Sequence, residues 1–139
     1  MKTSTLVILL FSISPLLHAQ SSQNQTHNIT AAYLSQGAIS ADIERGKWLW
    51  EKEYLHNSTL AKRSCTSCHT SNLKNPGKHL KTQKAIKAMS ISVNPQRFTR
   101  LKKVDKWFKR NCKWTMGREC TVQEKLDITA YIIQSGTTL

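Results

Sequence analysis

Two cysteines and a histidine near the middle of the chain are the residues best suited to chemistry. They form the pentapeptide Cys65-Thr66-Ser67-Cys68-His69, which has the C-x-x-C-H spacing that attaches c-type haem. The two thiols lie one helical turn apart, so both can form thioether bonds with vinyl groups on one edge of a porphyrin. The adjacent imidazole of His69 can then bind the iron as the proximal ligand. The motif predicts one covalently bound haem c.

Two other kinds of site use cysteines at this spacing. A thioredoxin-like redox pair is expected within a βαβ pattern, which the flanking residues do not show. A structural zinc site needs a second pair of ligands at motif spacing, and Cys112 and Cys120 do not provide one. Haem is therefore the preferred interpretation.

The first 19 residues have the pattern of a secretory signal peptide. A positive start at Lys2 precedes an apolar run from Leu6 to Leu17, and Leu17-His18-Ala19 is a plausible cleavage site. The apolar run is shorter than the roughly 20 residues that cross a bilayer, so we expect cleavage and no membrane anchor. Because c-type haem is attached outside the cytoplasm, the expected location is a bacterial periplasm.

Two cysteines remain after haem attachment, Cys112 and Cys120. In an oxidising compartment they most simply pair as a disulfide, with two free or metal-bound thiols as the alternative. Closing a loop of this length is expected to stabilise the fold by about 2–3 kcal/mol in the chain-entropy model.

The chain is strongly basic, with 21 Lys and Arg against 8 Asp and Glu and a formal charge of +13. Removing Lys2 with the signal peptide leaves 20 basic residues against 8 acidic ones, a charge of +12. Such a charge suits nucleic acid, anionic lipid or an acidic protein partner. Export argues against nucleic acid, so we expect an acidic redox partner, with a merely solvated surface as the alternative.

The mature chain is expected to be all-α, with about four short helices around the haem. We expect a loose N-terminal segment over residues 20–39 and the cytochrome c domain over 40–139. The first helix is expected to begin at Ser40, whose side chain can cap it, and the third helix to run from Asn94-Pro95 to about Asn111.

The first and last helices are expected to cross closely. Thr121 to Glu124 form a capping box that starts the C-terminal helix. Gly46, inside the first helix, and Trp50 are expected to meet Tyr131 on the C-terminal helix. This pattern around a C-x-x-C-H motif resembles the class I cytochrome c fold.

The residues alone leave the ligand on the other face of the iron open. Met116 lies 47 residues after His69 and is the default by spacing; it would make a conventional His/Met electron carrier. Asn111 falls near the inward stripe of the third helix, where an asparagine by itself usually only ends a helix. Met89 follows the motif too closely, and the other histidines of the mature chain are expected to be surface or loop residues: His27, His56 and His79.

Four stretches of the chain resemble the SHP-type (sphaeroides haem protein) cytochromes c: residues 64–69, 92–99, 103–112 and 117–121. The likeness covers most of the chain from Glu44 onward. It implies that Asn111 is the distal ligand of ferric iron and that Cys112 and Cys120 form a disulfide beside the haem. The chain departs from the family's pattern at three positions where Gly or Pro is expected: Gln83, Ala88 and Ile91.

The resemblance implies a periplasmic monohaem cytochrome c whose ferrous iron binds small ligands (O₂, NO, CO). It also implies electron donation by a dihaem cytochrome c and a membrane cytochrome b. An amide oxygen is a hard, weak donor that suits Fe(III) better than Fe(II), so reduction is expected to release Asn111. A peroxidase or nitric oxide oxidoreductase would need a distal acid or base. The stretch near Asn111 offers three candidates for that role, Lys113, Arg118 and Glu119. A ligand-binding electron-transfer protein is favoured over a dedicated enzyme.

Overall fold

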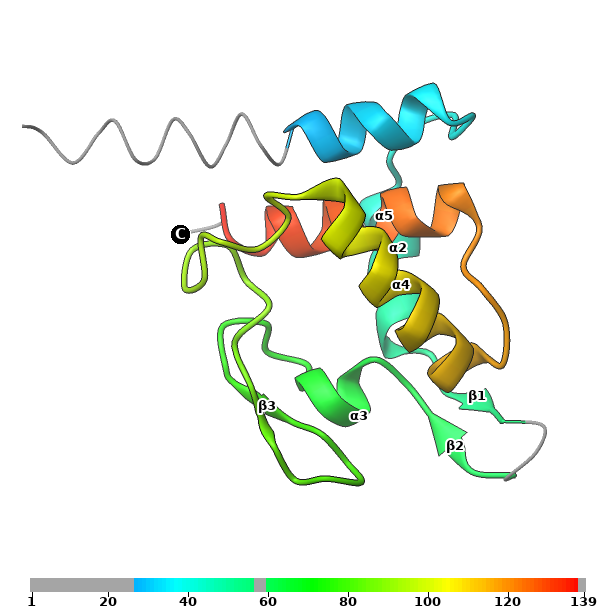
Figure 1. Ribbon diagram of the computed structural model, residues 1–139, viewed down its shortest axis with the longest axis vertical. Helices are drawn as coiled ribbons and strands as arrows, with labels where there is room; N and C mark the ends of the chain where they lie inside the picture. Colours follow the sequence, from blue (N-terminus) through cyan, green and yellow to red (C-terminus); the bar gives the residue numbers. More distant parts are fainter. Residues whose placement is uncertain (1–26, 57–59, 138–139) are drawn as a thin grey trace, which may run out of the picture.

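The computed structural model describes residues 27–56 and 60–137. Its main elements are a helix over residues 27–35, α2 (Ile43–Glu51), α3 (Thr66–His69), α4 (Leu101–Met116) and α5 (Val122–Gln134). Two antiparallel hairpins of two-residue strands complete it, with β1 (Tyr54–Leu55) paired to β2 (Lys62–Arg63) and β3 (Gly77–Lys78) paired to β4 (Ala85–Ile86). The all-α prediction is confirmed. In Figure 1, α3 lies between the two hairpins, below α4 and α5.

The predicted crossing of α2 and α5 is present and explains the glycine inside α2. A Cβ atom at Gly46 would collide with the backbone carbonyl of Asp127, and it would also touch the Cβ of Tyr131 at 3.0 Å. One turn later, the rings of Trp50 and Tyr131 pack with centroids 6.4 Å apart. Only glycine allows the two backbones to approach so closely.

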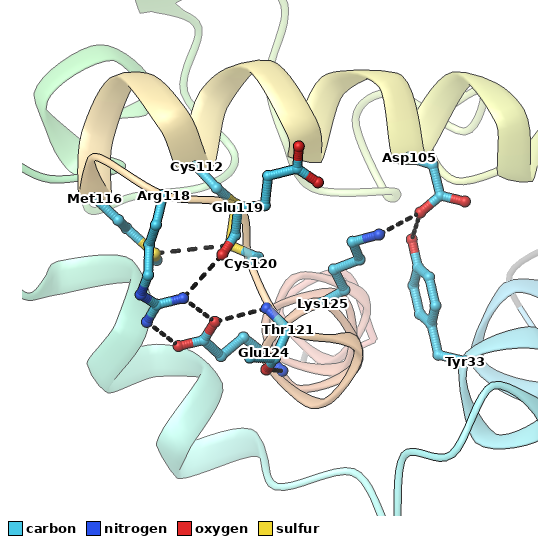
Figure 2. Close-up of a disulfide and its surroundings, with 10 residues drawn as sticks. All are labelled: Tyr33, Asp105, Cys112, Met116, Arg118, Glu119, Cys120, Thr121, Glu124 and Lys125. Carbon is cyan, nitrogen blue, oxygen red and sulfur yellow. Dashed lines mark hydrogen bonds and ion pairs between the residues drawn. A yellow bond between two sulfur atoms is a disulfide. The ribbon is translucent and has the colours of Figure 1, made fainter.

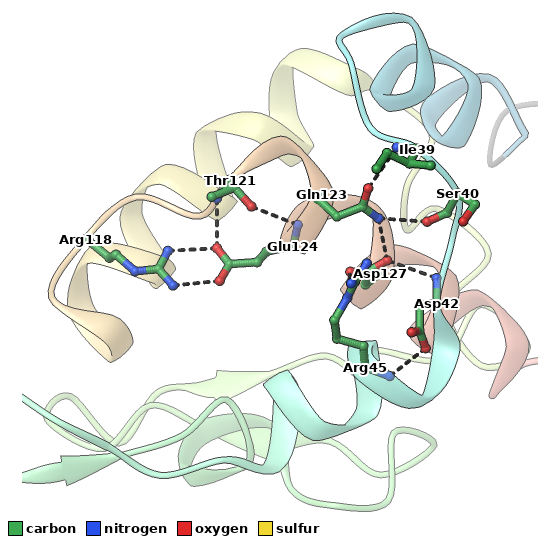
Figure 3. A network of polar contacts seen from close by, with 9 residues as sticks. All are labelled: Ile39, Ser40, Asp42, Arg45, Arg118, Thr121, Gln123, Glu124 and Asp127. Atoms are coloured by element: carbon green, nitrogen blue, oxygen red, sulfur yellow. Dashed lines mark hydrogen bonds and ion pairs between the residues drawn. The ribbon is translucent and has the colours of Figure 1, made fainter.

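Polar contacts fix the start of α2 against α5. The helix begins after Asp42, whose carboxylate accepts a hydrogen bond from the backbone N–H of Arg45 at 2.9 Å, so the expected cap at Ser40 is wrong by two residues. The buried carboxylate of Asp127 accepts bonds from Arg45 Nε (2.6 Å), Gln123 Nε2 (2.9 Å) and the Asp42 N–H (2.9 Å). This network is shown in Figure 3. A buried carboxylate with three donors is fully compensated for its lost hydration.

The capping box predicted at the start of α5 is also present. The Thr121 hydroxyl accepts a bond from the Glu124 N–H at 3.2 Å, and the Glu124 carboxylate accepts one from the Thr121 N–H at 2.8 Å. Arg118 forms a two-point ion pair with the same carboxylate at 2.6 and 2.7 Å (Figure 3). The turn between α4 and α5 is thereby tied to the first turn of α5.

The loose segment expected over residues 20–39 is wrong for its described part. Residues 27–35 form a helix, and Ile29 and Tyr33 are buried in the core with exposures of 2% and 0%. The Tyr33 hydroxyl donates to Asp105 on α4 at 3.1 Å, and Lys125 on α5 binds the same carboxylate at 3.0 Å (Figure 2). Ile29 and Tyr33, spaced i and i+4, lie on one face of the helix and dock it on the core. The signal peptide expected over residues 1–19 lies outside the described residues.

The third predicted helix exists, but its boundaries were wrong at both ends. Residues 94–100 form turns, and α4 begins at Leu101. It continues past Asn111 to Met116, where Gly117 adopts a left-handed φ of 75° and its N–H bonds to the Lys113 carbonyl at 3.2 Å. Glycine in this conformation is the usual stop for a helix. Asn111 therefore lies inside the helix and does not end it.

Candidate haem site

The C-x-x-C-H motif forms a single helical turn. The His69 N–H bonds to the Cys65 carbonyl at 3.0 Å, so Cys65 and Cys68 lie one turn apart, and neither thiol is in a disulfide. Ser64 begins the turn, since its Oγ accepts from the Ser67 N–H at 3.2 Å and the Ser67 Oγ accepts from the Ser64 N–H at 3.0 Å. The geometry of the turn matches the double thioether attachment that the spacing predicts.

The state of the thiols argues against a redox pair. Burial, and then the neighbouring Cys68, raises the pKa of the Cys65 thiol to about 12. Reactive redox cysteines need the opposite shift, because only the thiolate is nucleophilic. The described strands are two residues long, so the chain also lacks, over the described ranges, the parallel βαβ unit of a thioredoxin.

His69 is held by α2 on one side. The ring of Trp50 packs on the imidazole with centroids 5.4 Å apart, and the Trp50 Nε1 lies 3.4 Å from the Thr70 carbonyl oxygen that it donates to. Burial, and then the positive charge of Arg97, lowers the pKa of His69 to about 4. The imidazole is therefore neutral at physiological pH and keeps the lone pair that a metal ligand needs.

The surroundings of the His69 imidazole show whether the site suits a haem iron. Its Nδ1 is buried and has no hydrogen-bond partner among the described residues. Across those same residues, no group of three or more His, Cys, Asp and Glu side chains could hold a metal ion directly. A bare zinc site is therefore not supported over this part of the chain. Two free cysteines and a neutral histidine on one turn suit an iron that a covalently attached porphyrin supplies.

The β3–β4 hairpin packs directly on the motif. A Cβ atom at Gly77 would collide with the Cys68 carbonyl and approach the His69 Cα to 3.0 Å. Behind the hairpin, Met89 and Ser90 both donate their backbone N–H groups to the Leu73 carbonyl, at 3.0 and 2.8 Å. The Met89 side chain belongs to the buried core, which is a structural role.

The predicted disulfide is present at the C-terminal end of α4. Cys112 and Cys120 are bonded with a Cα–Cα distance of 5.6 Å, and both are buried. The Sδ of Met116 lies 3.7 Å from the Cys120 Sγ; since a disulfide sulfur has no proton to donate, this is a van der Waals contact between sulfur atoms. Figure 2 shows the Met116 side chain directed toward the disulfide. Asn111 is exposed and forms no side-chain hydrogen bond with the residues that the structure describes.

Trp114 is the site residue that the sequence analysis missed. Its backbone carbonyl accepts a bond from Arg63 Nη1 at 2.9 Å, and the Arg63 guanidinium lies 4.3 Å from the centre of its indole ring. The ring of His79 lies 6.4 Å away on the β3–β4 side. Trp114 thus connects α4 to the residues just before Cys65. Its spacing of three residues from Asn111 could have indicated it, but the helix was expected to end at about Asn111 and in fact continues to Met116.

The three residues considered as a distal acid or base, Lys113, Arg118 and Glu119, are engaged in surface ion pairs. Glu119 pairs with Lys113 at 3.0 Å and with Lys109 at 3.7 Å, and Arg118 pairs with Glu124. The hydrogen bond from Lys113 is the main reason that the pKa of Glu119 lies below its usual value. A carboxylate fixed in its charged form is a poor general acid at neutral pH.

Comparison with known proteins places these features in a family. Residues 36–132 match a family model described as a domain of unknown function, DUF1924. The chain is 36% identical over 107 residues to the cytochrome c-type protein SHP of Cereibacter sphaeroides, which covers 75% of this chain and 79% of that protein. The chain belongs to the SHP family of c-type cytochromes. SHP-family membership implies covalent haem, and the Cys65 and Cys68 pair fits that attachment.

Solved structures agree with the family assignment. Oxidised SHP, described as an oxygen-binding cytochrome c, superposes on this SHP-family chain with a TM-score of 0.70 and 33% identity, covering 78% of this chain and 96% of that one. Cytochrome c'' of Methylophilus methylotrophus is 29% identical over 138 residues, or 96% of this chain and 95% of that protein. Its solution structure, which concerns haem-ligand detachment, gives a TM-score of 0.67 at 28% identity and covers 85% and 96% of the two chains. This protein is a monohaem c-type cytochrome related to both. Over its described residues, no helix is long and apolar enough to cross a membrane.

Proposed function

We propose that this chain is a periplasmic electron-transfer cytochrome whose ferrous haem binds O₂ or NO, with Asn111 as a ligand of ferric iron that leaves on reduction. The haem, when bound, supplies a one-electron redox centre with a face available to small ligands. The observation that supports Asn111 over Met116 is the continuity of α4 through both residues.

On a continuous helix, residues five apart point about 140° away from each other. Asn111 and Met116 therefore cannot both face the haem. Met116 has its sulfur against Cys120. Asn111 lies about 60° around the helix from Trp114, whose carbonyl and ring contact Arg63, two residues before Cys65. The side of α4 that carries Asn111 is thus the side that is linked to the haem motif.

The chemistry of an amide side chain fits a redox-dependent ligand. Its oxygen is hard and neutral, so it binds Fe(III) better than the softer Fe(II). Once released, the amide keeps two N–H donors, which can hydrogen-bond a diatomic ligand close to α4. The Cys112–Cys120 disulfide begins at the next residue and limits how far Asn111 can move away.

The proximal side needs no change between oxidation states. His69 is neutral, and Trp50 holds its ring from α2. Lys113 and Glu119 pair with each other and Arg118 pairs with Glu124, so each of these three candidates for a distal acid or base is already engaged. This supports a ligand-binding electron carrier over a peroxidase or an oxidoreductase.

We also propose an acidic redox partner, of the kind that a dihaem cytochrome c fed by a membrane cytochrome b would provide. The outer side of α4 carries exposed lysines that we call the α4 basic face: Lys102, Lys103, Lys106 and Lys109. Among the ion pairs of the described residues, only Lys109 of these four has an acidic partner, Glu119 at 3.7 Å. A uniform positive face of this kind steers an acidic protein toward one side of the molecule.

Optical spectra of the purified holoprotein test the proposal most simply. Spectra are recorded in the oxidised and reduced states, before and after adding carbon monoxide. The proposal predicts a six-coordinate ferric spectrum and a ferrous spectrum that changes on adding carbon monoxide. A low-spin spectrum in both states, with no response to carbon monoxide, would instead identify a His/Met carrier.

A further inference from the structure

Arg97 is a half-buried cation in the turns that connect β4 to α4. Its Nε donates to the Ala88 carbonyl at 3.1 Å, and its Nη2 donates to the Lys87 carbonyl at 2.6 Å. Asn94 Nδ2 donates to the same Ala88 carbonyl at 3.3 Å. A guanidinium has five N–H groups, so three remain for another acceptor. The two backbone bonds fix the direction in which those three point.

The charge of Arg97 has no acidic partner over the described residues. All eight Asp and Glu side chains of the protein lie there, and their ion pairs go to other cations: Arg45, Lys62, Lys109, Lys113, Arg118 and Lys125. Burial lowers the pKa of Arg97, and no carboxylate offsets that effect. Buried charges are normally paired because desolvation is costly, so an anion from outside the polypeptide is expected here.

Three observations place this cation at the edge of the haem site. The Ala88 carbonyl that it binds directly precedes Met89 and Ser90, whose N–H groups bind the carbonyl of Leu73, four residues after His69. The residues whose carbonyls it binds also line a surface depression of about 330 Å³ together with Lys74 and Asn94. The next residue, Phe98, is buried with a positive φ of 55°, a strained conformation for an aromatic residue. That backbone turns Phe98 into the core while Arg97 is held by the carbonyls.

We propose that Arg97 binds a haem propionate through the free edge of its guanidinium, with Lys74 and Lys87 at the rim of the same anionic site. A planar guanidinium matches a carboxylate with two parallel hydrogen bonds. The proposal rests on the covalent haem of the proposed function. It does not depend on which residue binds the distal face of the iron.

The test is the midpoint potential of the holoprotein as a function of pH, measured for Arg97→Gln, Arg97→Lys and the control Arg100→Gln. Arg100 is exposed and three residues away, so its removal changes the net charge equally without emptying the site. We expect Arg97→Gln to lower the potential, since loss of a nearby cation favours Fe(III). The potential should also become pH-dependent near neutrality, because a propionate without its cation has a raised pKa. Arg97→Lys should show a smaller effect, and Arg100→Gln almost none.

A structural role for Arg97 gives a different result. If the guanidinium only holds the Ala88 and Lys87 carbonyls, Arg97→Gln and Arg97→Lys will lower the unfolding temperature while the potential and its pH profile match Arg100→Gln. That outcome overturns the proposal. Should Arg97→Gln fail to fold, Arg97→Lys alone decides between the same two outcomes. Carbon monoxide binding by the ferrous protein should be the same in all three variants, so a failure here is distinguishable from a failure of the Asn111 assignment.

Discussion

Arg63, two residues before Cys65, and Trp114 on α4 are joined twice, by a hydrogen bond of 2.9 Å from Nη1 to the Trp114 carbonyl and by a guanidinium lying 4.3 Å from the indole centre. The carbonyl belongs to the last turn of α4 and has no acceptor role within the helix, so Arg63 satisfies an unpaired group at the negative end of the helix dipole. This link sets where α4, and with it Asn111, sits relative to Cys65.

Removing Arg63 should therefore loosen the attachment of α4 to the residues before Cys65. We expect Arg63→Ala to lower the free energy of unfolding by about 1–3 kcal/mol, from the lost charged hydrogen bond and cation–π contact. The ferric protein should also gain high-spin character. Denaturant unfolding and the ferric optical spectrum measure the two effects. Lys62→Ala is the matched control, since Lys62 is exposed and paired only to exposed Glu53 at 3.6 Å; equal effects from both variants would show that the link has no special role.

The disulfide should matter for stability and for the position of Asn111. Reducing Cys112–Cys120, or replacing both cysteines by serine, should cost about 2–3 kcal/mol, because it frees a short loop in the unfolded chain. It should also loosen the last turn of α4, which ends at Met116. Mass spectrometry of an unreduced digest should find the two peptides linked. Recovery of both thiols alkylated without reductant would refute the disulfide in the native protein.

Glu124 should make the stability contributed by the turn between α4 and α5 sensitive to acid. The hydrogen bond from Arg118 is the main cause of its lowered pKa, with the Thr121 backbone adding to it. A carboxyl whose folded pKa lies below the unfolded value of about 4.3 stabilises the fold above that pH and loses its contribution as the pH falls through the folded pKa. Glu124→Gln should thus be less stable than wild type by about 1 kcal/mol at pH 7, and the difference should disappear in acid. Thermal unfolding across pH 3–7 measures it; a difference that grew in acid would contradict the assignment.

The α4 basic face should affect the rate of association with an acidic electron donor more than the affinity for it. Replacing Lys102, Lys103 and Lys106 together by glutamine should slow the bimolecular reaction with an acidic electron donor and weaken its salt dependence. Stopped-flow reduction at increasing ionic strength measures both. Lys78, Lys81 and Lys84, exposed around the β3–β4 hairpin, are the control set. The docking role is wrong if wild-type rates are flat from low to physiological ionic strength.

Much of the fold could be predicted because local patterns and tertiary contacts agree. Gly46, Trp50 and Tyr131 are spaced so that two helices can cross, and the Thr121 to Glu124 capping box is a purely local signal. The haem motif carries its geometry in five consecutive residues. Such features depend on spacing alone, which the sequence contains in full.

The errors came from features decided by packing. The helix over residues 27–35 is short and is held by Ile29, Tyr33 and the distant Asp105. The α4 boundaries depend on a left-handed Gly117 and on turns at 94–100, where Asn94 and Arg97 bind the Ala88 carbonyl. Gln83, where the family pattern expects a small or rigid residue, indeed adopts a left-handed φ of 57°. A single sequence does not show that a non-glycine residue will accept such a conformation.

The identity of the ligand of the ferric iron is tested most directly by the optical spectra of Asn111→Ala and Met116→Ala, measured side by side. Asn111→Ala should open the ferric iron to water or added anions and leave carbon monoxide binding by the ferrous protein largely intact. Met116→Ala should leave the ferric spectrum almost unchanged, because its sulfur contacts Cys120. If the Met116 variant loses low-spin character in both oxidation states while the Asn111 variant keeps it, Met116 and not Asn111 is the distal ligand.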